Sequence, residues 1–450
     1  MTTIDPGSSR VFHRELDRHY PNMTRADGYR VFDDEGAEYL DAVGGGAGVV
    51  NIGYGVQEVI EAIQRQVERL PFIHNQKFTH PLQEQLAEML IERAPTFSRV
   101  AFCQGGAEAN ETAIRLARSY HFERGDPNRW RLISPAQAYH GSTMATLALT
   151  GRPSLKDPYG PYLRDQLHIP PEDPRTDPDG QRGLENLERT IGEAGPDSIA
   201  AYFCEPVSAA AAPGLQAPDP FYRGLQDLAD RYGFLIVFDE VITGVGRTGS
   251  FYAEERIPCR PDIITSAKGL GGGYLPIAAV LASERVYEPI AKGSRDFSHG
   301  HTFNGYPLAC AASIAVLEYL KHHKLVERVR DLGPVVAEIL RDALKGCDVV
   351  DEVRGQGFLL GVTYRAPDGE FLDSDLRFAR RVDVAALDEG LLVYSTQPTS
   401  DGYMGDQTML TPAFTTTEDD FVEMSQRLSR AVQRATSDAA ADKPMHAIVG

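Results

Sequence analysis

The sequence predicts an α/β fold with a largely parallel sheet, and two features of its middle part carry this prediction. Between about residues 99 and 282, short apolar runs end abruptly in polar or glycine residues, and helical patterns follow them. Such runs, separated by helices, are typical of parallel strands buried on both faces. The runs are Val100–Cys103, Leu132–Ile133, Ile199–Cys204, Phe234–Phe238 and Ile263–Ala267. The second feature is the segment Ala107–Glu123, whose apolar residues lie mostly along one helical face.

The two ends of the chain predict a second, smaller α+β domain. The turn Asp34–Gly36 stands between arms of alternating apolar residues, which indicates a hairpin. Late in the chain, strand-like segments begin at Gly357 and Gly390. We therefore expect residues 1–50 to form the N-terminal segment of the small domain, 51–312 the large domain, and 313–450 the C-terminal part of the small domain. The polar stretch Pro170–Arg189 predicts a surface excursion, and the tail from about Thr436 predicts a loosely held end.

Composition narrows the class of protein. The 450 residues are 42% hydrophobic and 24% charged, which is ordinary for a soluble globular protein. A formal net charge of −19 argues against nucleic acid and anionic membranes as partners.

No window approaches the roughly 18 apolar residues of a membrane span, and the polar start Met1–Arg10 lacks a signal region. We expect a cytoplasmic protein. Its five scattered cysteines, without a Cys-x-x-Cys pair, favour neither a disulfide framework nor a zinc site.

Polar residues follow the predicted strands at the places where those strands end. Ligands of parallel sheets gather beyond the carboxyl ends of the strands, so we expect these residues to converge on one site. They are Gln104-Gly105-Gly106, Tyr139-His140-Gly141, Glu205-Pro206, Asp239-Glu240 and Lys268-Gly269.

Lys268 and Asp239 are the strongest candidates for chemistry. Lys268 follows an apolar strand, and burial there would depress the pKa of its amine and make it a nucleophile and base. For a lone lysine, reaching past the strand end to water is the more frequent role. Asp239 follows five apolar residues, so its carboxylate needs a cationic partner. A protonated pyridine nitrogen is one such partner, and an arginine or a metal are others, although no histidine cluster has metal-ligand spacing.

The neighbouring strand ends offer places for an anion and for a flat ring. Gly105, Gly106 and Ala107 stand between a strand and a helix, where a helix N-terminus favours an anion. This loop is neither a dinucleotide fingerprint nor a Walker loop. Glycine turns between a strand and a helix are common, so the glycine loop alone is a weak signal. Tyr139 can stack on one face of a ring and Val241 on the other, although plain core packing is the more frequent role for such residues.

Together these segments resemble the class III aminotransferases, the pyridoxal-phosphate family of the ornithine, γ-aminobutyrate and ω-amine transaminases. The likeness extends from about residue 28 to residue 421. The matching stretches, in the order and spacing of the family, are Gly106-Ala-Glu-Ala-Asn-Glu-Thr-Ala, Tyr139-His-Gly-Ser-Thr, Glu205-Pro-Val, Phe238-Asp-Glu-Val-Ile-Thr-Gly-Val-Gly-Arg-Thr-Gly, Ala267-Lys-Gly-Leu-Gly-Gly-Gly-Tyr, Thr302-Phe-Asn-Gly-Tyr-Pro-Leu-Ala-Cys-Ala-Ala and Val353-Arg-Gly-Gln-Gly.

The resemblance implies fold type I, with pyridoxal 5'-phosphate bound in the large domain. It implies that Lys268 carries the cofactor as a Schiff base and that Asp239 pairs with the pyridine nitrogen. The remaining cofactor-site residues that it implies are Gly106 and Ala107 at the phosphate, Tyr139 and Val241 on the two faces of the ring, Glu205 near the cofactor hydroxyl or the substrate, and Thr302 at the phosphate of the neighbouring subunit. Gly105 and His140 are expected to contribute to the cofactor site as well. The implied enzyme is a homodimer with shared active sites. It moves an amino group from an amine donor to a carbonyl acceptor by a ping-pong mechanism.

The chain departs from the family pattern at one informative place. Many members that use α-ketoglutarate or α-amino acids carry an arginine within Gly-Asp-x-x-Arg-x-x-Pro-Pro. Here the segment is Gly405-Asp-Gln-Thr-Met409-Leu-Thr-Pro412-Ala413, so a bidentate arginine–carboxylate pair is missing. Either the preferred donor lacks a carboxylate there, or another arginine binds it. Gly105 also replaces a frequent serine, which removes one hydroxyl contact to the phosphate.

Two other interpretations of the sequence stay open. An aminomutase, racemase or decarboxylase needs the same lysine and aspartate. A catalytically silent relative, kept for binding or regulation, would not need to retain both Lys268 and Asp239.

Overall fold

The computed structural model describes residues 3–164, 166–396 and 405–441. At its centre is a seven-stranded sheet in the order β6-β12-β11-β10-β9-β7-β8. The strands are β6 (Phe97–Cys103), β7 (Arg131–Pro135), β8 (Leu167–Ile169), β9 (Ile199–Cys204), β10 (Leu235–Asp239), β11 (Ile263–Ser266) and β12 (Ala278–Ser283). β12 runs antiparallel to both of its neighbours, and the other pairs are parallel. The predicted α/β fold with a mostly parallel sheet is confirmed.

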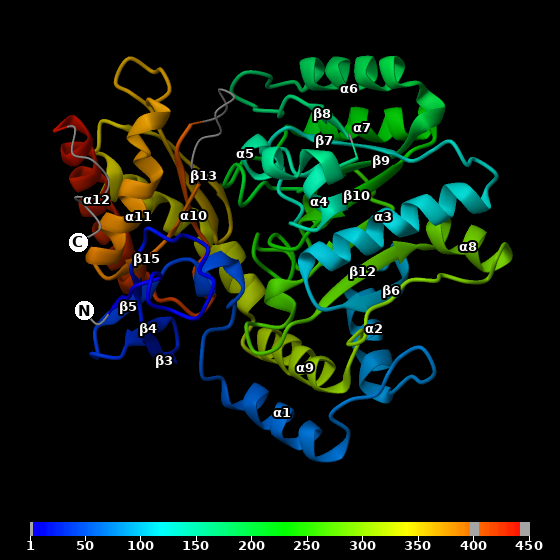
Figure 1. The fold of residues 1–450 in the computed structure, drawn as a ribbon, viewed down its shortest axis with the longest axis horizontal. Helices are drawn as coiled ribbons and strands as arrows, with labels where there is room; N and C mark the ends of the chain where they lie inside the picture. Colours follow the sequence, from blue (N-terminus) through cyan, green and yellow to red (C-terminus); the bar gives the residue numbers. More distant parts are fainter. Residues whose placement is uncertain (1–2, 165, 397–404, 442–450) are drawn as a thin grey trace.

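Helices cover both faces of this sheet, because successive side chains of a strand point to opposite faces. In β10, Val237 packs with the apolar residues of α3 (Gly106–Glu123), while Phe238 packs with those of α7 (Asp219–Tyr232). The amphipathic segment expected at 107–123 is therefore a helix, α3, that packs on one face of the sheet (Figure 1). The other helices of this part are α1 (Gln57–Arg69), α2 (Pro81–Arg93), α4 (Met144–Leu149), α5 (Pro153–Lys156), α6 (Gln181–Ala194), α8 (Glu284–Lys292) and α9 (Pro307–His322).

Segments from both ends of the chain combine beside the central sheet. β15 (Leu391–Leu392) pairs in parallel with β5 (Glu38–Asp41), which continues through β4 (Arg30–Asp33) to β3 (Met23–Asp27). The antiparallel pair β4–β5 confirms the predicted hairpin. Figure 1 shows these N-terminal strands beside the C-terminal helices. The remaining elements here are β1 (Thr3–Ile4), β2 (Tyr20–Pro21), α10 (Leu325–Leu344), β13 (Val350–Gln356), β14 (Leu359–Tyr364), α11 (Phe378–Asp388), β16 (Tyr394–Thr396), β17 (Gln407–Leu410) and α12 (Glu418–Ala440). The domain boundaries remain a prediction.

Two expectations need correction, and a third falls mostly outside the described residues. The strand expected from Gly390 is divided between β15 and β16, which lie in different sheets. The polar stretch 170–189 is a surface excursion only in part, because Asp177 is buried and accepts hydrogen bonds from the first backbone amides of α6. The tail from about Thr436 is helical as far as Ala440, and residues 442–450 lie outside the described ranges. None of the helices in the described ranges is long and apolar enough to cross a membrane.

Candidate active site

A cavity of about 290 Å³ opens at the carboxyl ends of the central strands. Its walls bring together eight of the residues that the sequence predicts for the site, which are Gly106, Ala107, Tyr139, His140, Glu205, Asp239, Val241 and Lys268. The convergence follows from the sheet, since β7, β9, β10 and β11 all end on this side.

Lys268 lies directly after β11, at the start of a short 3-10 turn, with the backbone in the left-handed region at a φ of 48°. Its Nζ donates a hydrogen bond to the carbonyl oxygen of Ala47 at 2.8 Å. Burial lowers the pKa of this amine to about 8, against the opposing effect of Asp239 and Glu205. Lys268 as a whole is half-buried, and within the described part of the chain it forms no ion pair. The role predicted for its amine stays a prediction.

Asp239 ends β10 and is only 4% exposed. Its Oδ2 accepts hydrogen bonds from Asn110 Nδ2 at 2.7 Å and from His140 Nδ1 at 2.8 Å. Its Oδ1 accepts one from the backbone amide of Val241 at 3.1 Å. These contacts orient the carboxylate at the base of the cavity. Asn110 and His140 act on Asp239 and so position it.

Glu205 directly follows β9 and is half-buried. Its Oε2 accepts a hydrogen bond from the backbone amide of Tyr139 at 3.2 Å, and its Oε1 from that of Ala209 at 3.1 Å. Burial, together with the charge of Asp239, raises the pKa of Glu205 to about 7. This carboxyl therefore exchanges its proton close to neutral pH.

The glycine loop is packed tightly around the start of α3. A Cβ at Gly106 would lie 2.8 Å from Val241 Cγ1, and one at Gly141, whose φ is +129°, would lie 2.6 Å from the Cβ of Ala107. Side chains at either position would occupy the space between the loop and the cavity wall. The bare backbone amides at the start of α3 are a suitable site for an anion.

The sequence model of the family described as aminotransferase class III matches residues 11–432. A probable aminotransferase of Mycobacterium tuberculosis is 36% identical over 83% of this chain and 82% of its own length. The acetylornithine aminotransferase of Methanopyrus kandleri is 37% identical over 78% of this chain and 83% of its own.

The chain belongs to the class III aminotransferases. Two solved structures support this at the level of the fold. A transaminase of the marine bacterium Virgibacillus has a TM-score of 0.90 at 28% identity, covering 96% of this chain and 98% of its own. An amine transaminase from an uncultivated Pseudomonas species, in the PLP-bound internal aldimine form, has a TM-score of 0.86 at 30% identity, covering 95% of both chains. The implied fold type I is confirmed.

Aminotransferases of class III depend on pyridoxal phosphate, and the residues of this cavity fit that group. The amine of Lys268 has no carboxylate partner among the described residues. The carboxylate of Asp239, the free amides at the start of α3, and Tyr139 supply what a pyridinium ring with a phosphate needs. No group of three or more His, Cys, Asp or Glu side chains with metal-binding geometry occurs in the described residues.

Two predicted residues of this aminotransferase lie outside the cavity wall. Gly105 precedes the first residue of α3 and does not line the cavity. Thr302 is exposed in the segment before α9 and likewise does not line it. The resemblance assigned Thr302 to the neighbouring subunit, so its exposure in one chain does not test that role.

Sequence reasoning missed several wall residues of the aminotransferase. They are Arg14, Ala47, Asn110, Ser142, Ala210, Ile242 and Tyr394. Asn110 had a detectable signal, because a polar residue interrupts the apolar face of α3 one turn after Gly106. Arg14, Ala47 and Tyr394 come from the two ends of the chain and carry no local pattern that indicates a site.

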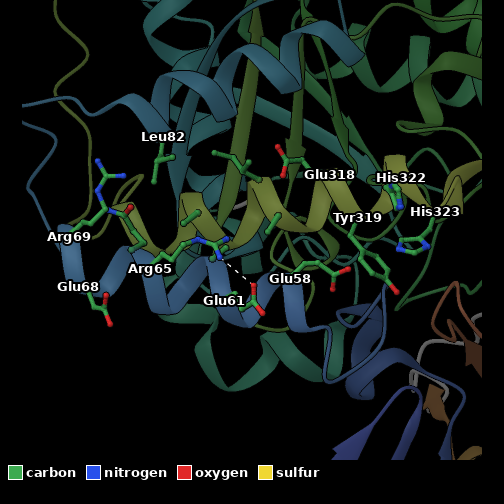
Figure 2. A pocket seen from close by; sticks show the side chains of 15 residues that line it. Glu58, Glu61, Arg65, Glu68, Arg69, Leu82, Glu318, Tyr319, His322 and His323 are labelled. Atoms are coloured by element: carbon green, nitrogen blue, oxygen red, sulfur yellow. Dashed lines mark hydrogen bonds and ion pairs between the residues drawn. The ribbon is translucent and has the colours of Figure 1, made fainter.

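A larger cavity of about 810 Å³ lies elsewhere, between α1 and α9. Figure 2 shows Glu58, Glu61 and Arg65 of α1 on one side and Glu318, Tyr319 and His322 of α9 on the other. Arg65 pairs with Glu61 at 3.4 Å, and both side chains are at least half exposed. This cavity is a groove with solvated charges and does not contain the strand ends.

Proposed function

We propose that Lys268 holds pyridoxal phosphate covalently through Nζ and that Asp239 pairs with the nitrogen of its ring. The observation that carries this proposal is an amine of lowered pKa and an ordered carboxylate in one cavity. The amides of Gly106 and Ala107 would hold the phosphate, while Tyr139 and Val241 would enclose the ring. Glu205 would face the cofactor hydroxyl or the substrate.

When bound, the cofactor supplies a reactive carbonyl carbon and a conjugated ring that accepts electron pairs. Lys268 supplies the proton chemistry. Its Nζ would remove a proton from the carbon that bears the donor's amino group. A pKa near 8 allows this amine to accept the proton and to release it again close to neutral pH. Asn110 and His140 keep Asp239 oriented throughout.

The reaction that these residues support is transfer of an amino group from an amine or amino acid to a keto acid or aldehyde by a ping-pong mechanism. Met409 supports a donor range that includes amines without a carboxylate. Its side chain is 1% exposed, packs with Val43 and Ile242, and lines the cavity where many relatives carry an arginine.

A panel of single half-reactions tests this function. Purified protein is loaded with pyridoxal phosphate, each donor is added alone, and loss of the visible absorbance of the bound cofactor is followed. Several amines should convert the cofactor completely without an acceptor, and a keto acid or aldehyde should then restore the absorbance. Absence of any visible absorbance with added cofactor would contradict the proposal, and release of carbon dioxide would favour a decarboxylase.

We also propose a cytoplasmic homodimer in which Thr302 reaches the cofactor phosphate of the other subunit. The five cysteines are all free and buried, which suits a reducing compartment. Thr302 and the neighbouring Phe303 are exposed, and the ring of Phe303 meets that of Phe72 edge-on at 5.2 Å. Exposed rings so close to a predicted phosphate ligand support a subunit contact here.

Light scattering should give twice the mass of the chain. Thr302→Ala should weaken retention of the cofactor if the site is shared. Ser298→Ala, at another exposed position of the same segment, should leave retention unchanged. A monomeric, fully active enzyme would contradict it.

A further inference from the structure

Arg14 lines the catalytic cavity although it lies far from the strand ends in the sequence. It belongs to the N-terminal segment that connects β1 to β2. Among the described residues of the cavity wall it contributes the one guanidinium group, and Lys268 is the other strong cation. Lys268 is needed for the cofactor, so Arg14 is the cation left for a substrate.

Ion pairs on the residues just after Arg14 fasten its segment to α11. Asp17 accepts a hydrogen bond from Arg380 at 3.1 Å, and Arg18 pairs with Asp383 at 2.9 Å. The side chain of Arg380 is 10% exposed and that of Asp383 is 17% exposed, so these pairs are partly shielded from water. The backbone that carries Arg14 is thereby held at the edge of the cavity.

The side chain of Arg14 has no hydrogen bond and no ion pair with any residue in the described ranges. It is close enough to Tyr139 for its charge to act on the phenol. Burial raises the pKa of Tyr139, and the charge of Arg14 acts in the opposite direction. A guanidinium that faces the cofactor-binding wall without a carboxylate partner can accept one from a ligand.

Met409, which stands where the family pattern has a carboxylate-binding arginine, cannot bind a carboxylate. Met409 lies in an apolar cluster with Val207, Ala209 and Leu359, and it offers no hydrogen-bond donor. A carboxylate placed against this cluster would lose its hydration without gaining a partner. In this cavity wall the guanidinium of Arg14, and not the side chain at position 409, can pair with a substrate carboxylate.

We propose that Arg14 binds the carboxylate of an amino-acid donor or keto-acid acceptor, and that it determines the preference for carboxylated over uncharged substrates. This inference rests on the proposed aminotransferase function. Arginine is suited to the task because its planar guanidinium can donate two parallel hydrogen bonds to one carboxylate. Arg14 acts on substrate selection, and the proton chemistry stays with Lys268.

The test compares matched substrates in single half-reactions of the holoenzyme. Alanine and isopropylamine differ by a carboxylate in place of a methyl group, and pyruvate and acetone differ in the same way. For Arg14→Met we expect kcat/KM for the carboxylated member to fall about 10- to 100-fold, as expected for one lost charge-assisted contact. The uncharged member should change less than about threefold. Arg14→Lys should recover part of the loss, because it keeps the charge without the paired geometry.

Arg10→Met is the matched control, since Arg10 is exposed on the same segment and does not line the cavity. Arg10→Met should leave kcat/KM unchanged for the carboxylated and the uncharged substrate alike. Calorimetric titration with propanoate, which cannot react, provides a readout independent of turnover. Its binding should weaken in Arg14→Met and persist in Arg10→Met.

An equal loss for charged and uncharged substrates, or no loss for either, would overturn the role of Arg14. Wild-type enzyme that converts uncharged amines but no carboxylated donor or acceptor would also overturn it, and would leave the proposed function intact. Failure of the wild type with every substrate would instead remove the proposed function itself.

Discussion

The catalytic cavity has two walls of different origin. The strand-end wall contains Lys268, Asp239, Glu205 and Tyr139, all of which follow strands of the central sheet. The chain-end wall contains Arg14, Ala47, Tyr394 and Met409, which come from the two ends of the chain. The strand-end wall carries buried or half-buried polar groups that are held by hydrogen bonds. The chain-end wall carries an exposed cation and apolar or aromatic side chains, which suits it to selecting substrates.

Substitutions in the strand-end wall should therefore damage turnover of every substrate, whereas those in the chain-end wall should change the ratio between substrates.

Lys268→Met should have the largest effect. Removing the group that holds the cofactor and moves the proton should lower kcat by about 10³-fold or more with all donors. Lys345→Met, at an exposed position of the chain, should retain full activity. The measurement is steady-state turnover of a carboxylated and an uncharged donor. Substantial activity in Lys268→Met would remove the assigned role of the strand-end wall.

Asp239→Asn should lower kcat about 100-fold, because the ring nitrogen would lose its anionic partner and the amide would face the donors of Asn110 and His140. The loss should be the same for carboxylated and uncharged donors. Asp227→Asn, exposed on α7, serves as the control. A loss confined to one kind of donor would mean that Asp239 selects substrates.

Glu205→Gln should change how stability depends on pH. The folded pKa of Glu205, about 7, lies above its ordinary 4.5, so the folded state holds this proton more tightly than the unfolded state. Wild-type stability should therefore fall, relative to the variant, as pH rises from about 5 to 7. The difference should amount to about 2 kcal/mol.

Denaturant unfolding of the cofactor-free proteins across this pH range measures the effect. Arg14→Met, from the chain-end wall, should follow the wild type at every pH. Parallel curves for Glu205→Gln and the wild type would contradict the electrostatic cost assigned to the strand-end wall.

Met409→Arg should have the smallest effect and a selective one. Restoring the clamp position should raise kcat/KM for α-ketoglutarate about five- to tenfold in the half-reaction, through one new charge-assisted contact. The kcat/KM for an uncharged aldehyde should not rise in Met409→Arg. In the control variant Met409→Leu, kcat/KM should rise for neither acceptor. No gain for α-ketoglutarate would show that position 409 does not limit the use of this acceptor.

Local patterns were sufficient for much of the fold and of the strand-end wall. The apolar runs before Glu205, Asp239 and Lys268 lie in β9, β10 and β11, and the rule that ligands gather at carboxyl ends brought the three residues together. Asn110 was missed, because its contact with Asp239 depends on how α3 packs over the sheet. The burial of Asp177 was missed as well, because its partners are the amides that begin α6.

By itself, the amino-acid sequence determined the class of fold and the family, and it indicated the residues that we propose carry the chemistry. These depend on strand periodicity and on motifs whose members follow one another at short range. Only the tertiary structure decided which residues face Lys268 from the other side. Ala47, Arg14 and Tyr394 reach the cavity because β15 pairs with β5 and because ion pairs to α11 hold the N-terminal segment in place. Such long-range contacts depend on packing between distant segments, and no local pattern in the chain records them.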